Sequence, residues 1–160
     1  MMKSEIFTGG CLCDTVRYEV RGPLFDAHYC HCRTCQKASG APVIAGAFLS
    51  RDALRFTHGE PKFYGSSPIV ERGFCADCGT YLLYQPLIKE WSDWTIITIS
   101  SLDHPESLPP ERHYGVESRI PWFDVRDNLP REQYEDGFIE ILSDENHEER
   151  EAILRRFGAQ

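Results

Sequence analysis

The seven cysteines are the residues of this sequence best suited to chemistry, and all of them fall into three short clusters. The clusters are Cys11-Leu12-Cys13, the segment Cys30-His31-Cys32-Arg33-Thr34-Cys35, and Cys75-Ala76-Asp77-Cys78-Gly79. Thiolates two or three residues apart can hold one zinc ion from a single turn of chain. Because their number is odd, the cysteines cannot all form disulfides within the chain. The clustering therefore predicts metal binding rather than a set of unconnected core thiols.

Two ways of sharing metal ions among these cysteines are open. In the first, Cys30, Cys32 and Cys35 form a three-ligand site, and the remaining four, Cys11, Cys13, Cys75 and Cys78, form a second site. In the other, the Cys32/Cys35 and Cys75/Cys78 pairs share one ion and leave three cysteines unused. We favour the first partition because it uses all seven. A closed four-cysteine site is structural, whereas a three-ligand site leaves a position open for water or substrate, as in catalytic zinc.

A histidine could instead close the three-cysteine site. His31 lies between two of the ligands, and we do not expect its ring to reach the same ion. The remaining candidates for a fourth ligand are His28, His58, His104 and His113. With such a ligand the second site would be structural as well.

The segments that position these clusters are predicted to be short β-strands. Val16, Tyr18 and Val20 alternate with charged residues, which is the period of a half-buried strand. The β-branched run 94–99 is the strongest strand signal. Further strand candidates cover residues 25–29, 42–49, 54–56, 62–64, 69–70 and 81–84. Many short strands at near-regular spacing predict a mainly β fold in one zinc-binding domain over residues 1–160.

The C-terminal region differs and predicts a short helix over about residues 144–157. Ser143 can cap it, acidic residues come early, and Arg155 and Arg156 come late, which matches the helix dipole. We interpret it as a solvated surface helix, the alternative being a helix that binds a partner.

Composition and charge restrict the partners. The net charge is −8 and the sequence contains no basic run, so we expect no nucleic-acid partner. The longest apolar stretch, residues 41–49, is too short to span a bilayer, and the N-terminus has no secretory signal. We therefore expect a cytoplasmic protein without a membrane partner. The sequence does not indicate an oligomeric state.

Several motifs resemble the glutathione-dependent formaldehyde-activating (GFA) / centromere protein V family. The principal ones are Gly9-Gly10-Cys11-Leu12-Cys13, the Cys30–Cys35 segment running on to Ala38-Ser39-Gly40, and Phe74-Cys75-Ala76-Asp77-Cys78-Gly79-Thr80. Weaker matches are residues 54–61, Pro121-Trp122-Phe123 and Leu129-Pro130. The likeness covers about residues 8–130.

This resemblance implies a fold, two metal sites and a reaction. The implied fold is a β-tent of small antiparallel sheets built around a four-cysteine zinc site. The implied ligands are Cys11, Cys13, Cys75 and Cys78 for a structural zinc, and Cys30, Cys32 and Cys35 for a catalytic-type zinc. The implied enzyme is a carbon–sulfur lyase that joins glutathione to formaldehyde, giving S-hydroxymethylglutathione. Two zinc ions per chain and glutathione, as substrate or ligand, follow from it.

An open zinc suits that chemistry because zinc lowers the pKa of a bound thiol and holds it as thiolate. Glutathione's sulfur would then add to formaldehyde or a related small aldehyde. Arg33 and Lys37 flank the cysteines and are candidates for glutathione's carboxylates, although ordinary surface charges fit them equally well. Trp122 could wall a substrate pocket, although aromatic residues after a proline more often belong to a core.

Three other functions remain open from the sequence. The chain could bind glutathione or another thiol without catalysis, it could be a structural zinc module that binds a protein, or its thiolates could act as a redox switch. The three-ligand cluster argues against the purely structural module. No general acid or base stands at motif spacing, and the sequence therefore does not separate an enzyme from a binding protein.

Overall fold

The computed structural model describes residues 5–133 of the 160-residue chain. Its contacts divide the chain into two compact units, the first comprising Met1–Ala27 with Gly46–Pro109 and the second His28–Ala45 with Pro110–Gln160. The helix expected at about residues 144–157 lies outside the described residues. A single domain over the whole chain stays a prediction.

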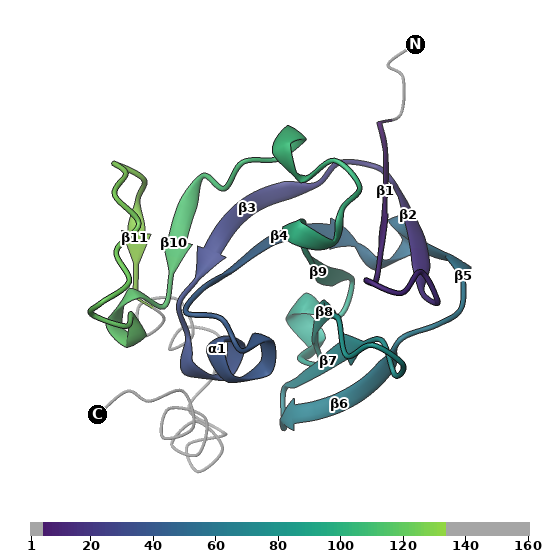
Figure 1. The fold of residues 1–160 in the computed structure, drawn as a ribbon, viewed down its shortest axis with the longest axis horizontal. Coiled ribbons are helices and arrows are strands. Elements are labelled where there is room, and N and C mark those ends of the chain that lie inside the picture. Colours follow the sequence, from purple (N-terminus) through teal and green to yellow (C-terminus); the bar gives the residue numbers. More distant parts are fainter. Residues whose placement is uncertain (1–4, 134–160) are drawn as a thin grey trace. The chain divides into compact units, whose positions relative to one another are not determined.

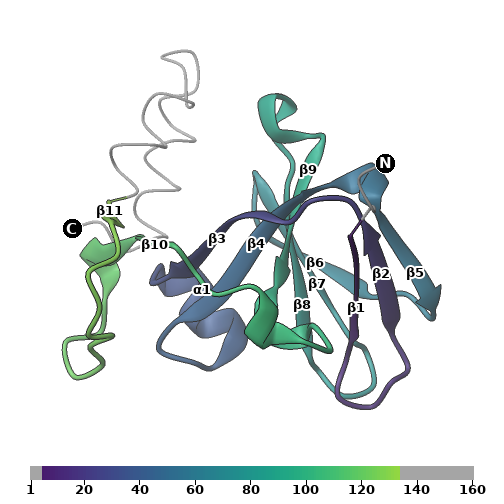
Figure 2. The same ribbon diagram turned by 90° about the horizontal axis from the view of Figure 1, so that it is seen from above.

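A three-stranded antiparallel sheet of the first unit carries the first cysteine pair. Its strands are β1 (Ile6–Gly10), β2 (Arg17–Arg21) and β5 (Leu54–His58), in the order β1-β2-β5 (Figure 2). Tyr18 and Val20 of β2 are buried, as the alternation predicts. The connection between β1 and β2 therefore presents Cys11 and Cys13 at the end of a fixed hairpin.

Five further antiparallel strands complete the first unit. They are β4 (Ile44–Ser50), β9 (Trp94–Thr98), β8 (Tyr81–Pro86), β7 (Val70–Phe74) and β6 (Lys62–Ser67), paired in that order. Leu49, Leu82, Leu83 and Ile97 are fully buried between them. The turn from β7 to β8 carries Cys75 and Cys78, and the register shifts between Gly73 and Phe74, directly before it.

The second unit surrounds the remaining cysteines with short elements. β3 (Phe25–Cys30) leads into α1 (Arg33–Ser39), the one α-helix of residues 5–133 (Figure 1). The end of β3 pairs in parallel with β10 (Arg112–Tyr114), which pairs in parallel with β11 (Arg131–Glu132). No helix of the described residues is long and apolar enough to cross a membrane.

The mainly β fold of small antiparallel sheets is confirmed, although the second unit departs from it locally. No expectation from the sequence covered β1, β10, β11 or α1, because these strands of two to five residues and this helix of seven show no clear period. Within the described part of the chain, the elements are connected by five 3-10 turns: η1 (Arg51–Ala53), η2 (Lys89–Trp91), η3 (Ile99–Ser101), η4 (Pro105–Ser107) and η5 (Val116–Ser118).

Gly59 supports the loop that carries the first cysteine pair. Its φ is +54°, and a Cβ there would lie 2.1 Å from the backbone oxygen of Thr15, two residues after Cys13. Gly40, at the C-terminal end of α1, has a similar φ of +69°, but a Cβ there would meet no atom within 4 Å. The two glycines share a left-handed backbone and differ in the space around them.

We predict that Gly59→Ala destabilises the protein more than Gly40→Ala. A left-handed alanine costs about 1–2 kcal/mol at either position, and the clash at residue 59 adds roughly 1–3 kcal/mol. Urea denaturation of both variants gives the comparison. Equal losses in free energy of unfolding would contradict the close contact between Gly59 and Thr15.

Candidate metal centres

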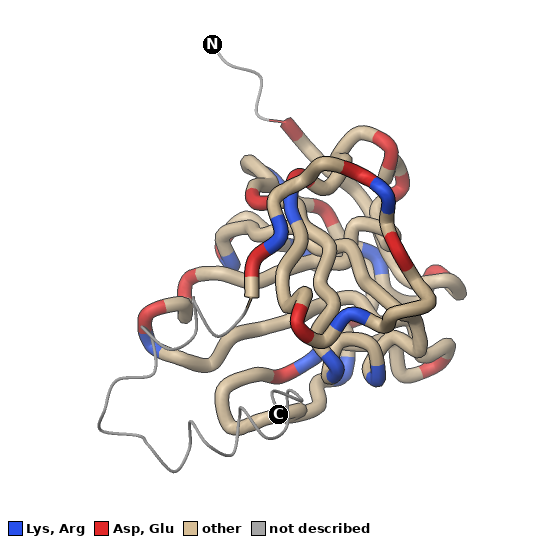
Figure 3. The backbone as a smooth tube through the Cα atoms, turned by 90° about the vertical axis from the view of Figure 1, so that its left-hand side faces the viewer, with Lys and Arg blue, Asp and Glu red and all other residues tan. Residues whose placement is uncertain are grey.

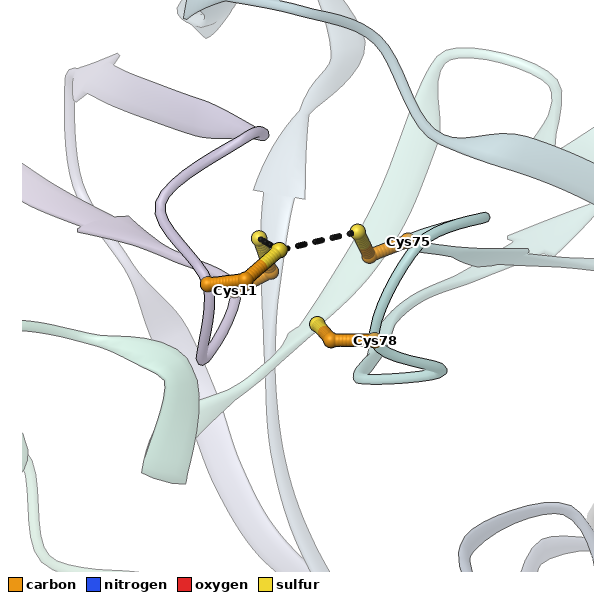
Figure 4. A group of neighbouring side chains, drawn as sticks. Cys11, Cys75 and Cys78 are labelled. Atoms are coloured by element: carbon orange, nitrogen blue, oxygen red, sulfur yellow. Dashed lines mark hydrogen bonds between the residues drawn. The ribbon is translucent and has the colours of Figure 1, made fainter.

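Four cysteines of the first unit bring their sulfur atoms to one point. The Sγ atoms of Cys11, Cys13, Cys75 and Cys78 all lie within 4.8 Å of one another. Figure 4 shows the sulfur atoms of Cys11, Cys75 and Cys78 turned toward the same space. Cys13 Sγ lies 3.5 Å from Cys11 Sγ and 3.7 Å from Cys75 Sγ. Zinc–sulfur bonds of about 2.3 Å in tetrahedral geometry separate neighbouring sulfurs by roughly 3.8 Å, so the donor set fits a zinc ion.

Backbone hydrogen bonds shape the turn at Cys11. The Cys11 N–H donates to the Val16 carbonyl at 2.9 Å, and the Asp14 N–H donates to the Cys11 carbonyl at 3.2 Å. The Val16 N–H donates to Cys11 Sγ at 3.2 Å. This donor favours a thiolate at Cys11, because an N–H bond to sulfur stabilises the charged form.

The turn at Cys75 closes in a similar way. The Cys75 N–H donates to the Thr80 carbonyl, and the Gly79 N–H donates to the Cys75 carbonyl, each at 2.9 Å. Gly79 has a φ of +75°, as expected for the residue that ends such a knuckle. The Thr80 hydroxyl accepts the Leu12 N–H at 3.1 Å and lies 3.1 Å from Cys78 Sγ. Thr80 thus joins the two turns.

The thiols of this group differ in acidity. Hydrogen bonds from the Thr80 hydroxyl and backbone lower the pKa of Cys78 to about 5. The Cys78 backbone N–H acts to lower the pKa of Cys75, but burial and the thiols of Cys78 and Cys11 outweigh it and raise that pKa to about 11. Four sulfurs this close therefore ionise together only when a cation compensates their charge.

The second group consists of Cys30, Cys32 and Cys35, which also lie within 4.8 Å of one another. Cys30 ends β3, Cys32 caps α1, and Cys35 lies in the first turn of that helix. The Cys35 N–H donates to Cys32 Sγ at 3.3 Å, and the sulfurs of Cys30 and Cys35 are 3.5 Å apart. All three residues are at most 2% exposed. One strand end and one helical turn therefore position a buried three-thiol set.

Hydrogen bonding separates the acidities of these thiols. The thiols of Cys30 and Cys35 bond to Cys32 and hold its pKa well below the ordinary value. Hydrogen bonds with Cys32 and Cys35, together with burial, raise the pKa of Cys30 well above its ordinary value. The cluster therefore favours one negative charge on Cys32. Three buried thiolates would need a cation, which is what a metal supplies.

The next question is whether a side chain of the described residues supplies a fourth ligand to the second group. Among residues 5–133, no histidine, aspartate or glutamate joins the three cysteines in a metal-binding arrangement. His113 uses both ring nitrogens elsewhere, one toward His31 and the other toward Asp127. His28 packs its ring edge-on against Tyr114 at a centroid distance of 4.9 Å. The sulfur grouping is that of the favoured partition, whereas metal binding itself stays a prediction.

Gln36, Ser118 and Tyr114, which the sequence analysis did not single out, support the second group through contacts with His31 or its neighbours. The Gln36 side-chain amide donates to the carbonyls of His31 and Ser118, at 2.6 and 3.2 Å. The His31 N–H donates to the Tyr114 carbonyl at 2.9 Å. Burial lowers the pKa of His31 to about 4, so its ring is neutral. The placement of His31 between two cysteines was the one signal available from the sequence.

The residues predicted to contact the substrate differ in their exposure and their hydrogen bonds. Arg33 and Lys37, four residues apart in α1, share one face of the helix. The Arg33 guanidinium donates to the Gln36 side chain, while Lys37 is exposed. Trp122 is 76% exposed, with its ring edge toward Phe123, so its interpretation as a core residue is wrong. Figure 3 shows acidic and basic positions interspersed along the described backbone.

Comparison with known proteins decides the family. A family model described as "Glutathione-dependent formaldehyde-activating enzyme" matches residues 6–118. The chain belongs to this GFA family. An uncharacterized lyase of Schizosaccharomyces pombe is 30% identical over 80 residues, which cover 49% of this chain and 56% of that protein. The resemblance drawn from the cysteine motifs is thereby confirmed.

Two further comparisons are more distant or partial. A protein of Pyrenophora teres f. teres, provisionally named a glutathione-dependent formaldehyde-activating enzyme, is 32% identical over 83 residues, which cover 48% of this GFA-family chain and 44% of that protein. The chain thus spans about half the length of the curated relatives it matches. A Rhodobacter sphaeroides crystal structure aligns with a TM-score of 0.48 at 19% identity, over 78% of this chain and 99% of that one. Likeness at that level supports no conclusion.

We predict close to two zinc ions per chain in protein purified under reducing conditions without chelator, because two sulfur groups have ligating geometry. Elemental analysis against protein concentration measures the ratio. Chelation and reconstitution with zinc provide the control for loss during handling. A reproducible ratio near one after reconstitution would contradict a two-site protein.

We also predict that the two groups differ in their effect on stability. Cys11→Ser should lower the free energy of unfolding by several kcal/mol, because structural zinc binding contributes directly to folding. Cys32→Ser should leave a folded protein with one zinc fewer. Thermal unfolding and elemental analysis of both variants test this. Unfolding by Cys32→Ser with no effect of Cys11→Ser would reverse the assignment.

Proposed function

We propose that this GFA-family chain is a zinc-dependent carbon–sulfur lyase/synthase that resembles S-(hydroxymethyl)glutathione synthase. Its substrates would be glutathione and formaldehyde or a related small aldehyde. The observation that carries the proposal is the buried group of Cys30, Cys32 and Cys35, which no histidine or carboxylate among residues 5–133 completes. The family description and the word lyase in a relative's name support the same reaction class.

The proposed reaction is the addition of a thiol to an aldehyde. A carbon–sulfur bond forms, the carbonyl π bond breaks, and the proton of the thiol ends on the former carbonyl oxygen. Zinc, when bound, supplies a Lewis acid that favours the thiolate form of the attacking sulfur. Cys30, Cys32 and Cys35 would hold that zinc and leave its fourth position for glutathione. Burial of the group would keep water from competing with the thiol.

The first group would have a different role. Cys11, Cys13, Cys75 and Cys78 form a complete tetrahedral set and would hold a structural zinc. Their sulfurs come from two turns joined through Thr80, so a metal there would stabilise the first unit. Two zinc ions per chain would therefore divide between folding and chemistry.

Glutathione is anionic, and cations near the second group would favour it. Arg33 and Lys37 lie on α1, whose N-cap is Cys32, and could bind the carboxylates of glutathione. Exposed Trp122 offers an apolar surface for the peptide. We further propose that the protein works in the cytoplasm, where thiols stay reduced, and that it binds neither membranes nor, given its net charge of −8, nucleic acid.

A second candidate function is a zinc protein that binds thiols, or a protein partner, without catalysis. Burial favours it, because Cys30, Cys32 and Cys35 are at most 2% exposed and a substrate would need an opening to reach them. The two candidates differ in one measurement. An enzyme accelerates formation of the glutathione–formaldehyde adduct above the spontaneous rate, whereas a binding protein does not.

We predict that glutathione binds much more tightly than S-methylglutathione, because the free thiol is the proposed anchor. Binding near neutral pH should release a proton, since the sulfur is held as thiolate. Calorimetry in two buffers of different ionisation enthalpy measures both effects. Arg33→Ala or Lys37→Ala should weaken binding by about 1–3 kcal/mol, as expected for a hydrogen bond to a charged group.

Lys89→Ala is a matched control, because Lys89 lies in η2 of the first unit, whereas the second cysteine group belongs to the second unit. It should leave glutathione affinity unchanged. Equal binding of glutathione and its S-methyl ether would remove the sulfur from recognition and contradict the proposed function. Failure of both to bind, with two zincs present, would contradict glutathione as the thiol.

A further inference from the structure

Two buried histidines and a carboxylate form a continuous hydrogen-bonded chain next to the three-cysteine group. His31 Nε2 lies 2.8 Å from His113 Nδ1, and His113 Nε2 lies 3.1 Å from both carboxylate oxygens of Asp127. Both histidines are 1% exposed, whereas the Asp127 side chain is 24% exposed. Because His31 lies between Cys30 and Cys32, this chain ends on the backbone that carries two of the three thiols.

Asp127 sets the direction of these hydrogen bonds. An ionised carboxylate only accepts, so His113 must carry its proton on Nε2. The Nδ1 atom of neutral His113 then has a lone pair and accepts from His31, which must carry its proton on Nε2 as well. The Nδ1 atom of His31 is left as an acceptor. Charged rings at these positions would be costly because both are buried and lie against each other.

His31 Nδ1 supports this direction. It is buried and has no hydrogen-bond partner among the described residues. The opposite direction would place an N–H there, and buried unpaired N–H donors are rarer than buried unpaired acceptors. It would also set two lone pairs against each other, one on His113 and the other on Asp127. The protonation of both rings on Nε2 therefore follows from the contacts alone.

The backbone polar groups of His31 are also fixed. Its backbone N–H donates to the Tyr114 carbonyl at 2.9 Å, and its carbonyl accepts from Gln36 at 2.6 Å. The ring contact with His113 is thus the third anchor of a residue whose two neighbours are both cysteines of the group. Loss of that anchor would loosen the backbone between Cys30 and Cys32.

We propose that Asp127 and His113 are positioning residues for the three-cysteine group: they fix the tautomer of His31 and so hold Cys30 and Cys32 in ligating geometry. The inference rests on the proposed metal binding of that group, although the tautomers can be measured independently of any metal. Partners of this kind, one contact beyond the ligands, commonly change metal affinity by about 10- to 100-fold.

Asp127→Ala should release the hydrogen-bond direction. Both carboxylate oxygens lie 3.1 Å from His113 Nε2, so an asparagine would keep one acceptor there, whereas alanine removes both. The proton of His113 would then no longer be held on Nε2. His113 Nδ1 would no longer be fixed as an acceptor, so the proton of His31 would be released from Nε2 as well.

Nitrogen-15 NMR of histidine-labelled full-length protein tests the tautomers. We expect both His31 and His113 to be protonated on Nε2 in the unmodified protein, and a mixture of Nε2 and Nδ1 tautomers in Asp127→Ala. Asp124→Ala is the matched control, because Asp124 lies on the same loop and pairs with Arg119 at 3.5 Å rather than with a histidine. Protonation of His31 on Nδ1 in the unmodified protein would overturn the inference even if Asp127→Ala does not fold.

Cobalt(II) titration tests the consequence for the cysteines. The absorption band that Cys32→Ser removes reports the three-cysteine group, and the band that remains reports the other group. We expect Asp127→Ala to weaken cobalt binding at the three-cysteine band by about 10- to 100-fold, while the band of the other group and the Asp124→Ala protein stay unchanged. Mixed tautomers with unchanged cobalt affinity would overturn this inference alone. A missing three-cysteine band in the unmodified protein would overturn the proposed function together with it.

Discussion

The meeting of two short turns from distant parts of the chain is the constraint on which the first unit depends. Cys13 and Cys75 are separated by 62 positions, yet their sulfurs lie 3.7 Å apart. Bringing such segments together costs chain entropy, and thiolate repulsion adds to that cost unless a cation joins the group. Thr80 links the two turns through its contacts with Leu12 and Cys78. A bound metal would supply the larger share of the free energy that holds the turns together. The strands that flank both turns are antiparallel, which places each turn at a strand end.

The second cysteine group obeys a different constraint. Its three thiols come from six consecutive residues, so closure costs little, and burial dominates instead. Cys32 serves both as the cap of α1 and as a member of the group, which couples the local backbone to the sulfur geometry. The parallel pairing of β3 with β10 then brings His113 beside His31, 82 positions away. The three cysteines are close in sequence, but the contacts that support them come from residues far along the chain.

The segment that the family model matches does not include every residue that supports the second group. The GFA family model matches residues 6–118, which include all seven cysteines, His31 and His113. Asp127 lies beyond the matched segment. The two groups of sulfurs that could hold a metal therefore lie within the segment that the family model matches, whereas the Asp127 carboxylate that contacts His113 lies in the part of the chain that follows it.

The sequence by itself determined the mainly β character, most strand positions and the cysteine motifs, because two-residue alternation and short ligand spacing are local properties. Tyr18 and Val20 are buried as the alternation predicts, and Gly79 adopts the positive φ expected of a knuckle. Short elements such as α1 and β10 were missed, since a few residues carry no period. Trp122 was misassigned because its neighbours in sequence do not report its exposure.

Only the tertiary structure decided which distant groups meet. Spacing left the partition of the cysteines and the role of the histidines open, since neither depends on neighbours along the chain. The parallel pairing of β3, β10 and β11 places His113 against His31, and a loop returns Asp127 to His113. A histidine, a histidine and an aspartate at positions 31, 113 and 127 have no spacing that predicts a contact. Their hydrogen bonds exist because long-range strand pairing, and not local sequence, sets the distances between them.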